Sequence, residues 1–290
     1  MKATDTCLVC EQPLIVVTDI RVHPTCDMDP QIAVGDVFAT IRHGMIYTPR
    51  SGQRMIGPSE IGQPCERRIG YRLAQVPKTR VEDAAWMPFI GTSVHEQLAD
   101  IVARTELARW NPDGSNDPAP RWHVEERVTV GTVAGIDITG SCDLFDAQYG
   151  IVYDHKVVSK NKIRETYRPH GPGEQYRLQA HLYGKGFEDA GHDVRHVAII
   201  FWTRDGQFED RHVWTEPYDR QIAIDALARL ERINTLLTEL GPQDALPLLE
   251  ATESYCTYCP WFHRGANDPA KSCAGVEREI APRVPFASLS

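Results

Sequence analysis

The sequence lacks the features that would place it in several broad classes. It contains no apolar run long enough to cross a membrane, no secretory signal, no internal repeat and no low-complexity segment. Its formal net charge of −9 also argues against a surface that coats nucleic acid over its whole extent. The 290 residues can hold one sizeable domain and a small additional module. We therefore expect a cytoplasmic protein without a membrane partner.

Cysteine is sparse, with eight residues, and three of them form a metal-binding pattern with a histidine near the N-terminus. The pairs Cys7-x2-Cys10 and His23-x2-Cys26 are joined by twelve residues, a spacing typical of a zinc knuckle. Three thiolates and one imidazole suit tetrahedral zinc, and so short a segment needs a metal staple to fold. Because no ligand position is left open, the predicted zinc site is structural.

A second group of cysteines combines a C-x2-C pair near the C-terminus with one earlier and one later residue: Cys256, Cys259, Cys65 and Cys273. A C-x2-C pair alone is either redox-active or half of a metal site. Four thiolates suit zinc as well as an iron–sulfur cluster, so both alternatives stay open. Paired cysteines of this kind indicate a reducing compartment rather than a disulfide framework. Cys142 is left over and is expected to be a small buried residue.

The segment Arg127–Ser159 predicts a β-meander, because apolar residues recur along it and turn residues separate its last two strands at 146–150. If that turn is centred between Gln148 and Tyr149, Asp143 and Asp154 lie opposite one another. Lys156 is two residues beyond Asp154, so strand alternation sends both side chains to one face.

Two carboxylates in this position destabilise a sheet unless a cation lies between them. Mg²⁺ or Mn²⁺ is the simplest compensation, because both prefer oxygen ligands. Lys156 would then orient a water or stabilise the charge that develops on an attacked phosphate. The alternative is a solvated Asp-x-Lys pair on an exposed strand.

Two predicted helices carry further polar candidates. The first opens at Phe89–Glu96, with Thr92 or Ser93 as its N-cap and His95 in its first turn. The second contains Gln179 and Tyr183, which are four residues apart and share a face, as do Gln175 and Gln179. We also expect a helix at 59–74, strands at 194–203 and 207–213, and a long helix capped by Asp219.

In chain order, His95, Asp143, Asp154-x-Lys156 and Gln179-x3-Tyr183 resemble the PD-(D/E)XK nucleases of the RecB-like exonuclease branch. The resemblance implies an α/β fold with a mixed sheet flanked by helices. It makes His95, Asp143 and Asp154 metal ligands, with the His155 carbonyl as a fourth. Lys156 is then the catalytic lysine, and Gln179 and Tyr183 position DNA. The chain departs from the pattern in having Asp154 where glutamate is commoner.

The iron–sulfur subset of this branch holds a 4Fe–4S cluster with one early and three late cysteines. The resemblance therefore assigns such a cluster to Cys65, Cys256, Cys259 and Cys273. The thirteen residues between Cys259 and Cys273 are a longer gap than the pattern usually has, and a second zinc is the alternative. Basic residues beside the expected site form a predicted phosphate track, whose alternative is a solvated face: Arg67, Arg68, Arg72, Lys160, Lys162, Arg164 and Arg168.

These expectations divide the chain into a zinc-knuckle module at 1–43, a linker at 44–57, a nuclease core with an iron–sulfur cluster at 58–275 and a tail at 276–290. The function they imply is a metal-dependent DNA exonuclease acting at single-stranded or frayed ends, in phage-type recombination, replication or repair. A recombination or replication protein would then contact the zinc module. The alternatives are a structure-specific endonuclease and a non-catalytic DNA-binding adaptor.

Overall fold

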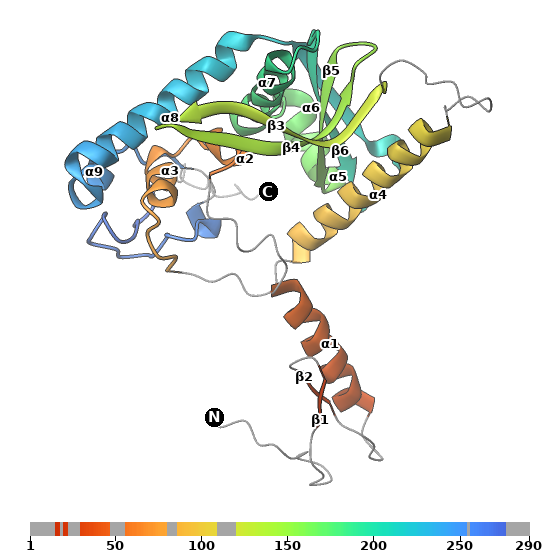
Figure 1. The fold of residues 1–290 in the computed structure, drawn as a ribbon. Coiled ribbons are helices and arrows are strands. Elements are labelled where there is room, and N and C mark those ends of the chain that lie inside the picture. The colour runs from red at the N-terminus through yellow and green to blue at the C-terminus, as the bar shows by residue number, and fades with distance from the viewer. Residues whose placement is uncertain are drawn as a thin grey trace, which may run out of the picture. The chain divides into compact units, whose positions relative to one another are not determined.

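The computed structural model describes residues 15–17, 20–22, 30–46, 56–79, 86–108, 120–253 and 256–276. The chain divides into two compact units, of which one comprises Met1–Gln53 with Glu82–Phe89 and the other Arg54–Val81 with Ile90–Ser290 (Figure 1). The predicted zinc ligands lie outside the described residues: Cys7, Cys10, His23 and Cys26. Most of the predicted tail, from residue 277, lies outside them as well.

The first unit contains a short hairpin and one long helix. Strands β1 (Ile15–Val17) and β2 (Ile20–Val22) pair in antiparallel fashion. Helix α1 (Pro30–Ile46) follows, and its Val37, Phe38 and Ile41 side chains are exposed. None of the helices in the described parts of the chain is both long and apolar enough to span a membrane.

The second unit is built around a five-stranded mixed sheet. Its strands follow in the order β3 (Trp122–Val133), β4 (Ile136–Asp146), β5 (Ile151–Val158), β6 (His196–Thr203) and β7 (His212–Pro217). Neighbouring strands are antiparallel except for β5 and β6, which are parallel. The predicted meander and the predicted mixed α/β class are confirmed.

Turn chemistry fixes the register of the meander. Ala134 and Gly135 both have positive φ, 50° and 75°, as a two-residue hairpin turn between β3 and β4 requires. Between β4 and β5, the Asp146 carboxylate accepts hydrogen bonds from the backbone N–H groups of Gln148 and Tyr149. Phe145 pairs with Val152, so the turn is centred between Gln148 and Tyr149, as predicted.

Helices flank this sheet. They are α2 (Pro58–Ile61), α3 (Glu66–Leu73), α4 (Trp86–Ala108), α5 (Lys160–Lys162), a π-helical turn (Ile163–Tyr167), α6 (Arg168–His170), α7 (Glu174–Asp189), α8 (Arg220–Leu240) and α9 (Pro242–Leu248). Helix α7 packs against β3, β5 and β6, and α8 packs against α7 and β3 (Figure 1). The buried apolar side chains of these elements form one core.

The expected helix at 59–74 is two helices, α2 and α3. At their junction, a Cβ on Gly62 would lie 2.5 Å from the backbone oxygen of Gln175, so α2 approaches α7 more closely than a side chain allows. Pro64 disfavours helical backbone at the residue before it. The Arg229 guanidinium of α8 donates to the carbonyls of Ile61 and Gln63, which satisfies the groups that a continuous helix would have paired.

Two other boundaries also differ from expectation. Helix α4 begins at Trp86, so Thr92 and Ser93 are not its cap and His95 lies in its interior rather than in its first turn. The expected strand at 207–213 begins at His212 instead. A 3-10 turn (Phe208–Asp210) precedes it, because the Asp210 carboxylate accepts from the backbone N–H of Gln207 at 2.8 Å.

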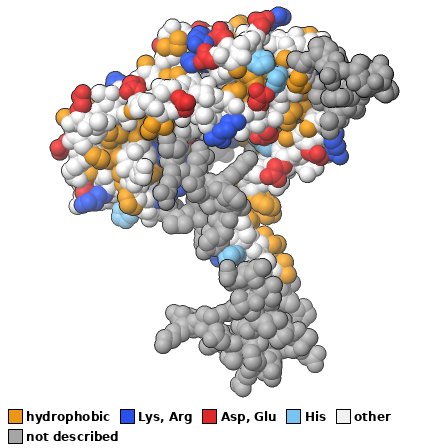
Figure 2. Space-filling view, viewed as in Figure 1, with side chains coloured by type: hydrophobic (Ala, Val, Ile, Leu, Met, Phe, Trp, Pro, Cys, Tyr) orange, Lys and Arg blue, Asp and Glu red, His pale blue; other side chains and the backbone are white. Residues whose placement is uncertain are grey.

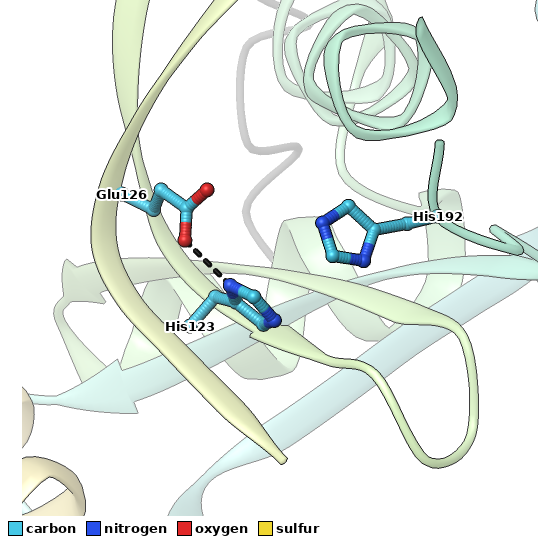
Figure 3. A group of neighbouring side chains, drawn as sticks. All are labelled: His123, Glu126 and His192. Atoms are coloured by element: carbon cyan, nitrogen blue, oxygen red, sulfur yellow. Dashed lines mark hydrogen bonds and ion pairs between the residues drawn. The ribbon is translucent and has the colours of Figure 1, made fainter. Parts of the chain in front are cut away.

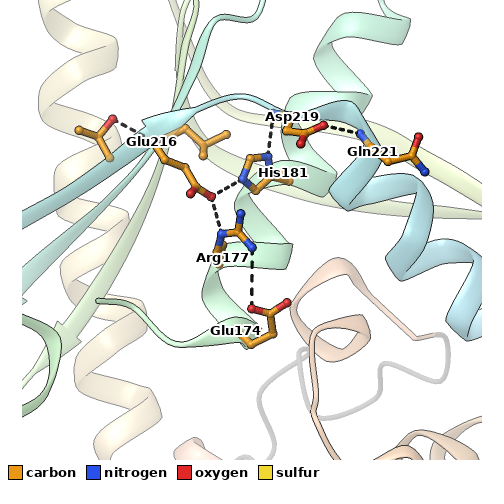
Figure 4. Close-up of polar contacts among 8 residues, drawn as sticks. Glu174, Arg177, His181, Glu216, Asp219 and Gln221 are labelled. Atoms are coloured by element: carbon orange, nitrogen blue, oxygen red, sulfur yellow. Dashed lines mark hydrogen bonds and ion pairs between the residues drawn. The ribbon is translucent and has the colours of Figure 1, made fainter. Parts of the chain in front are cut away.

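A polar network fastens α7 to the far edge of the sheet and to the start of α8 (Figure 4). Glu216 of β7 accepts from both Arg177 and His181 of α7, each at 2.6 Å. His181 is fully buried, and its Nδ1 accepts from the backbone N–H of Asp219 at 3.2 Å. Asp219 is the predicted N-cap of α8 and accepts from the N–H of Gln221. The network holds the middle of α7, where Gln179 lies, in one position on the sheet.

Candidate active site

The candidate site lies where β4 and β5 separate. The ladder between them pairs Leu144 with Tyr153, so the next pair in this register is Asp143 and Asp154. Instead of a backbone pair, the Asp143 Oδ2 atom accepts from the backbone N–H of His155 at 2.6 Å. The predicted opposition of Asp143 and Asp154 is confirmed, and the Asp143 carboxylate lies between the two strands.

Asp154 is 1% exposed and has two polar neighbours. Lys156 Nζ lies 2.5 Å from its Oδ2 atom, so the two side chains share a face, as strand alternation predicts. Gln179 Nε2 of α7 donates to its Oδ1 atom at 2.9 Å. Lys156 Nζ also lies 4.8 Å from the centre of the Tyr176 ring. A partly buried lysine and a buried carboxylate are thus held together by contacts from one helix.

The two glutamines of α7 have different partners. Gln179 reaches Asp154, whereas Gln175 Nε2 donates to the backbone oxygen of Ser59. Tyr183, one turn beyond Gln179, is also buried, and burial raises the pKa of its hydroxyl well above the usual range. Its hydroxyl oxygen would lie 3.0 Å from a Cβ on Gly140, so it reaches β4. Gln179 is therefore the glutamine that approaches the carboxylates.

His95 of α4 approaches the site from another element. Its Nδ1 atom lies 3.2 Å from Asp143 Oδ1. One ligand atom from each of His95, Glu125 and Asp143 lies within 4.8 Å of the others, so the three side chains are spaced to hold a metal ion. The structure thus brings together His95, Asp143, Asp154, Lys156 and Gln179 from α4, β4, β5 and α7.

The sequence reading did not single out Glu125. Val124 pairs with Leu144 and Glu126 with Cys142, so Glu125 lies opposite Asp143 on β3. If the register at the hairpin turn continued along both strands, Glu126 would lie opposite Asp143. The register instead shifts by one residue between Thr129 and Gly131. Glu125 also has a positive φ of 48°, which is uncommon for a residue with a side chain. Neither the register shift nor the positive φ of Glu125 can be recognised from a single sequence.

Burial and neighbouring charges shift the pKa values of the titratable groups in different directions. Burial, followed by the Asp143 charge, raises the pKa of Asp154 to about 6, against the opposing effect of Lys156. Burial also acts on Asp143, but the His95 hydrogen bond and charge outweigh it and lower the Asp143 pKa. The same contact raises the pKa of His95 despite its burial. Burial lowers the pKa of His155 to about 4, which keeps that imidazole neutral at pH 7.

These donors fit a divalent cation. Two carboxylates, Glu125 and Asp143, converge with the imidazole of His95, and Asp154 lies opposite Asp143 and pairs with Lys156. Oxygen-rich ligation of this kind suits Mg²⁺ or Mn²⁺, and one imidazole favours Mn²⁺. The Asp154 carboxyl keeps its proton up to about pH 6, because its charged form is destabilised there. A metal ion that takes the place of the proton would stabilise the charged form.

The second cysteine group lies in one place. Cys65, at the N-cap of α3, lines a pocket together with Cys256, Cys259 and Cys273. The pocket encloses about 320 Å³ of empty space, part of which is open to solvent. Tyr71 of α3 stacks on Trp261, with ring centres 5.5 Å apart, and donates to the carbonyl of Pro269 at 2.6 Å. The segment 256–276 is therefore fastened to α3, as the predicted clip requires. Cys142 is fully buried apart from this group.

The residues of the predicted phosphate track have different surroundings. Arg67 donates to the carbonyls of Leu246, Pro247 and Leu249, which joins α3 to the end of α9. Arg68 lines the cysteine pocket, and Arg72 pairs with Glu60. Lys160 pairs with Asp210, Arg164 with Glu165, and Lys162 lies over the Tyr167 ring. Figure 2 shows acidic and basic side chains interspersed over the face in view.

No family model and no curated protein matches the chain. Among solved structures, it is similar to SSO0001, with 18% identity and a TM-score of 0.47 over 82% of this chain and 98% of that one. It is also similar to an alkaline exonuclease from Laribacter hongkongensis, with 14% identity and a TM-score of 0.35 over 62% and 93%. A phage-related exonuclease from Haemophilus somnus 129PT has 13% identity and a TM-score of 0.37 over 60% and 82%. With likenesses this weak, we infer function from the side chains of the chain itself.

Proposed function

We propose that this chain is a metal-dependent deoxyribonuclease that hydrolyses phosphodiester bonds as an exonuclease. The observation that carries the proposal is the contact between Lys156 Nζ and Asp154 Oδ2, which lie 2.5 Å apart. It lies where the Asp143 carboxylate of β4 accepts from the backbone of β5. Asp154 is buried, Asp143 and Lys156 are partly buried, and taking charged groups out of water is costly even when they are paired. A fold that only needed to be stable would fill this position with apolar side chains.

The metal ligands we propose are His95, Asp143 and Asp154, with the carbonyl of His155 as in the family pattern, and we add Glu125 on its geometry. When bound, a divalent cation supplies an activated water and neutralises charge on the phosphate. Lys156 would hold its ammonium at the phosphate that is attacked, because Asp154 and the Tyr176 ring fix its position. His95 would keep Asp143 ionised, since their contact lowers the Asp143 pKa.

Gln179 and Tyr183 would position the catalytic groups and DNA. Gln179 donates to Asp154 and thereby fixes the carboxylate that also holds Lys156. Tyr183 lies one turn further along α7, and the network around Glu216 keeps this helix in place. A non-catalytic DNA-binding adaptor would have no use for Asp143, Asp154 and Lys156 in this arrangement.

We further propose that the four clustered cysteines hold a 4Fe–4S cluster, as the family resemblance implies. Their location supports it, because Cys65 and the C-terminal cysteines line one pocket although they are far apart in the sequence. Such a clip closes a very long loop, which is where a cross-link can stabilise most. Zinc remains the alternative, because four thiolates bind either metal.

The remaining assignments extend this proposal. Residues 1–43 would form the zinc module and contact a recombination or replication protein, 44–57 a linker, and 58–275 the nuclease core. Of the basic track, we propose six residues as phosphate contacts: Arg68, Arg72, Lys160, Lys162, Arg164 and Arg168. We assign Arg67 to the joint between α3 and α9.

Linear and circular single-stranded DNA test the mode of cleavage. The purified chain is incubated with Mn²⁺ and either end-labelled linear DNA or closed circular DNA, both single-stranded. An exonuclease releases nucleotides from the linear DNA and leaves the circle intact. Cutting of the circle would assign the chain to the endonucleases, and binding without cutting to the adaptors.

A further inference from the structure

Three side chains outside the candidate active site converge at a second point of the fold. His123 and Glu126 belong to β3, and His192 lies in the turn after α7. One ligand atom from each of the three lies within 4.8 Å of the others. Figure 3 shows His192 facing the other two side chains across a short gap.

A backbone distortion at Glu125 of β3 makes this cluster possible. Residues three apart on a regular strand point to opposite faces, so His123 and Glu126 would normally be separated by the sheet. Glu125, between them, has a φ of 48°, which breaks the alternation. As a result, His123 Nδ1 and Glu126 Oε2 lie 2.5 Å apart on the same side.

The unpaired nitrogen of His123 points to a missing ligand. When Nδ1 donates its hydrogen to Glu126, Nε2 retains a lone pair. That Nε2 atom is buried and has no hydrogen-bond partner within the described parts of the chain. Histidines that bind metals usually donate their other ring N–H to a carboxylate, which is the arrangement seen here. A buried acceptor without a partner is costly, and a cation would satisfy it.

His192 supplies a second imidazole. Its ring lies 4.7 Å from that of His123, edge to face. Phe145 and Phe187 line the inner side of the pair. Glu126 is 41% exposed, which leaves the cluster open to an ion from solvent.

We propose that His123, Glu126 and His192 form a second cation site, which takes zinc or a chemically similar divalent cation. The imidazoles of His123 and His192 would be its ligands, and Glu126, which holds the other ring nitrogen of His123, would orient that ring and add negative charge. Imidazole ligands suit zinc, in contrast to the oxygen-rich set around Asp143.

The bound cation would join the edge strand β3 to the end of α7. It would also hold the strand on both sides of Glu125, which lies opposite Asp143, so it would stabilise the candidate active site as well. The site does not depend on the proposed nuclease activity, because its ligands and its test involve neither Asp143 nor DNA.

Zinc stoichiometry of the full chain tests the proposal. Native mass spectrometry with excess Mg²⁺, which occupies the oxygen-rich site, counts zinc ions bound to the wild type, to His192→Gln and to Glu126→Gln. The thiolate sites are the same in all three and cancel in the comparison. The matched control is His196→Gln, an exposed histidine four residues from His192 that is outside the cluster.

We expect His192→Gln to bind one zinc equivalent fewer than the wild type, Glu126→Gln to bind that zinc more weakly, and the control to bind the same number as the wild type. Added zinc should also raise the melting temperature of the wild type and of the control more than that of His192→Gln. Circular dichroism of each variant shows that it is folded, and Glu126→Gln changes a partly exposed side chain that the fold does not need. Equal zinc stoichiometry in the wild type and both folded variants would overturn the proposal and leave the three residues as a packing cluster.

Discussion

Gln179 of α7 donates its side-chain amide to Asp154 of β5 at 2.9 Å, and both groups are buried. The bond links the helix to the strand that carries the candidate catalytic lysine. Asp154 thus accepts from Gln179 with Oδ1 and contacts Lys156 with Oδ2. The position of this carboxylate is thus set before any ligand arrives, which is what a preorganised site requires.

Removing this bond should affect stability and activity together. Gln179→Ala leaves Asp154 Oδ1 buried without a donor, which we expect to cost about 1–3 kcal/mol in the free energy of unfolding. Urea denaturation measures that loss, and cleavage assays should show a fall in rate at saturating Mn²⁺. The matched control is Gln175→Ala, one turn away on the same helix, which loses only the bond to the Ser59 carbonyl. Equal activity of the two variants would contradict the role of Gln179.

Lys156→Met should retain the fold and lose catalysis. The side chain keeps its length but no longer stabilises charge on the phosphate, an effect worth roughly 10²–10³ in rate for a lost donor in other enzymes. Single-turnover cleavage of end-labelled DNA measures it. Lys185→Met serves as the control, because Lys185 pairs with Asp189 on an outer part of α7. A Lys156→Met enzyme as fast as this control would remove the lysine from the mechanism.

Glu125 should contribute to the metal site although the sequence gives no sign of it. Glu125→Gln keeps the shape of the side chain and removes a negative charge from the group with His95 and Asp143. We expect weaker Mn²⁺ binding, measured by titration calorimetry, and a higher Mn²⁺ concentration for half-maximal cleavage. Glu209→Gln, in an exposed 3-10 turn, should change neither. Unchanged Mn²⁺ affinity in Glu125→Gln would restrict the ligands to the four named in the sequence analysis.

Metal affinity should depend on pH through Asp154. Burial, and then the Asp143 charge, raise the pKa of Asp154 to about 6, so the carboxyl is protonated below that pH and cannot ligate a cation. Above it the carboxylate is free to bind. We therefore expect the Mn²⁺ affinity to fall as pH falls through about 6, by roughly tenfold per unit for each proton that must be displaced, from Asp154 and from His95, whose pKa is also raised. An affinity that stays constant between about pH 7 and 5 would show that Asp154 is not a ligand.

The cysteine pocket predicts a coloured protein. If it holds a 4Fe–4S cluster, protein prepared without oxygen should be brown and contain iron and acid-labile sulfide in near-equal amounts. Cys256→Ser should bleach the colour and destabilise the core, because the clip between α3 and the segment 256–276 is lost. Cys142→Ser should do neither, since Cys142 lies outside the pocket. Colourless protein with an extra zinc, prepared with iron supplied, would decide for the alternative.

The sequence predicted most of the meander, because its strands and its second turn have local causes. Asp146 binds the turn that follows it, and this fixes the opposition of Asp143 and Asp154. Alternation then placed Lys156 beside Asp154, and helical spacing placed Gln179 and Tyr183 on one face. The four cysteines were grouped by resemblance, and the structure locates them around one pocket.

What the sequence did not predict depends on contacts between distant segments. The break between α2 and α3 follows from the approach of Gly62 to α7 and from the Arg229 guanidinium. The late start of β7 follows from one side chain, Asp210, that binds a backbone N–H three residues before it. The register shift between Thr129 and Gly131 changes which residue lies opposite Asp143, and the positive φ of Glu125 breaks the alternation that would separate His123 from Glu126.

Cleavage by the Asp143→Asn variant tests the central claim most directly. The change keeps the shape of a side chain that accepts from the His155 N–H and contacts His95, and it removes one negative charge from the metal site. The wild type and the variant are incubated with end-labelled single-stranded DNA, with and without Mn²⁺. We predict that the wild type releases nucleotides only when Mn²⁺ is present. A folded variant should release none, with or without Mn²⁺. Release by the variant at the wild-type rate, or by the wild type after complete removal of metal, would contradict the account.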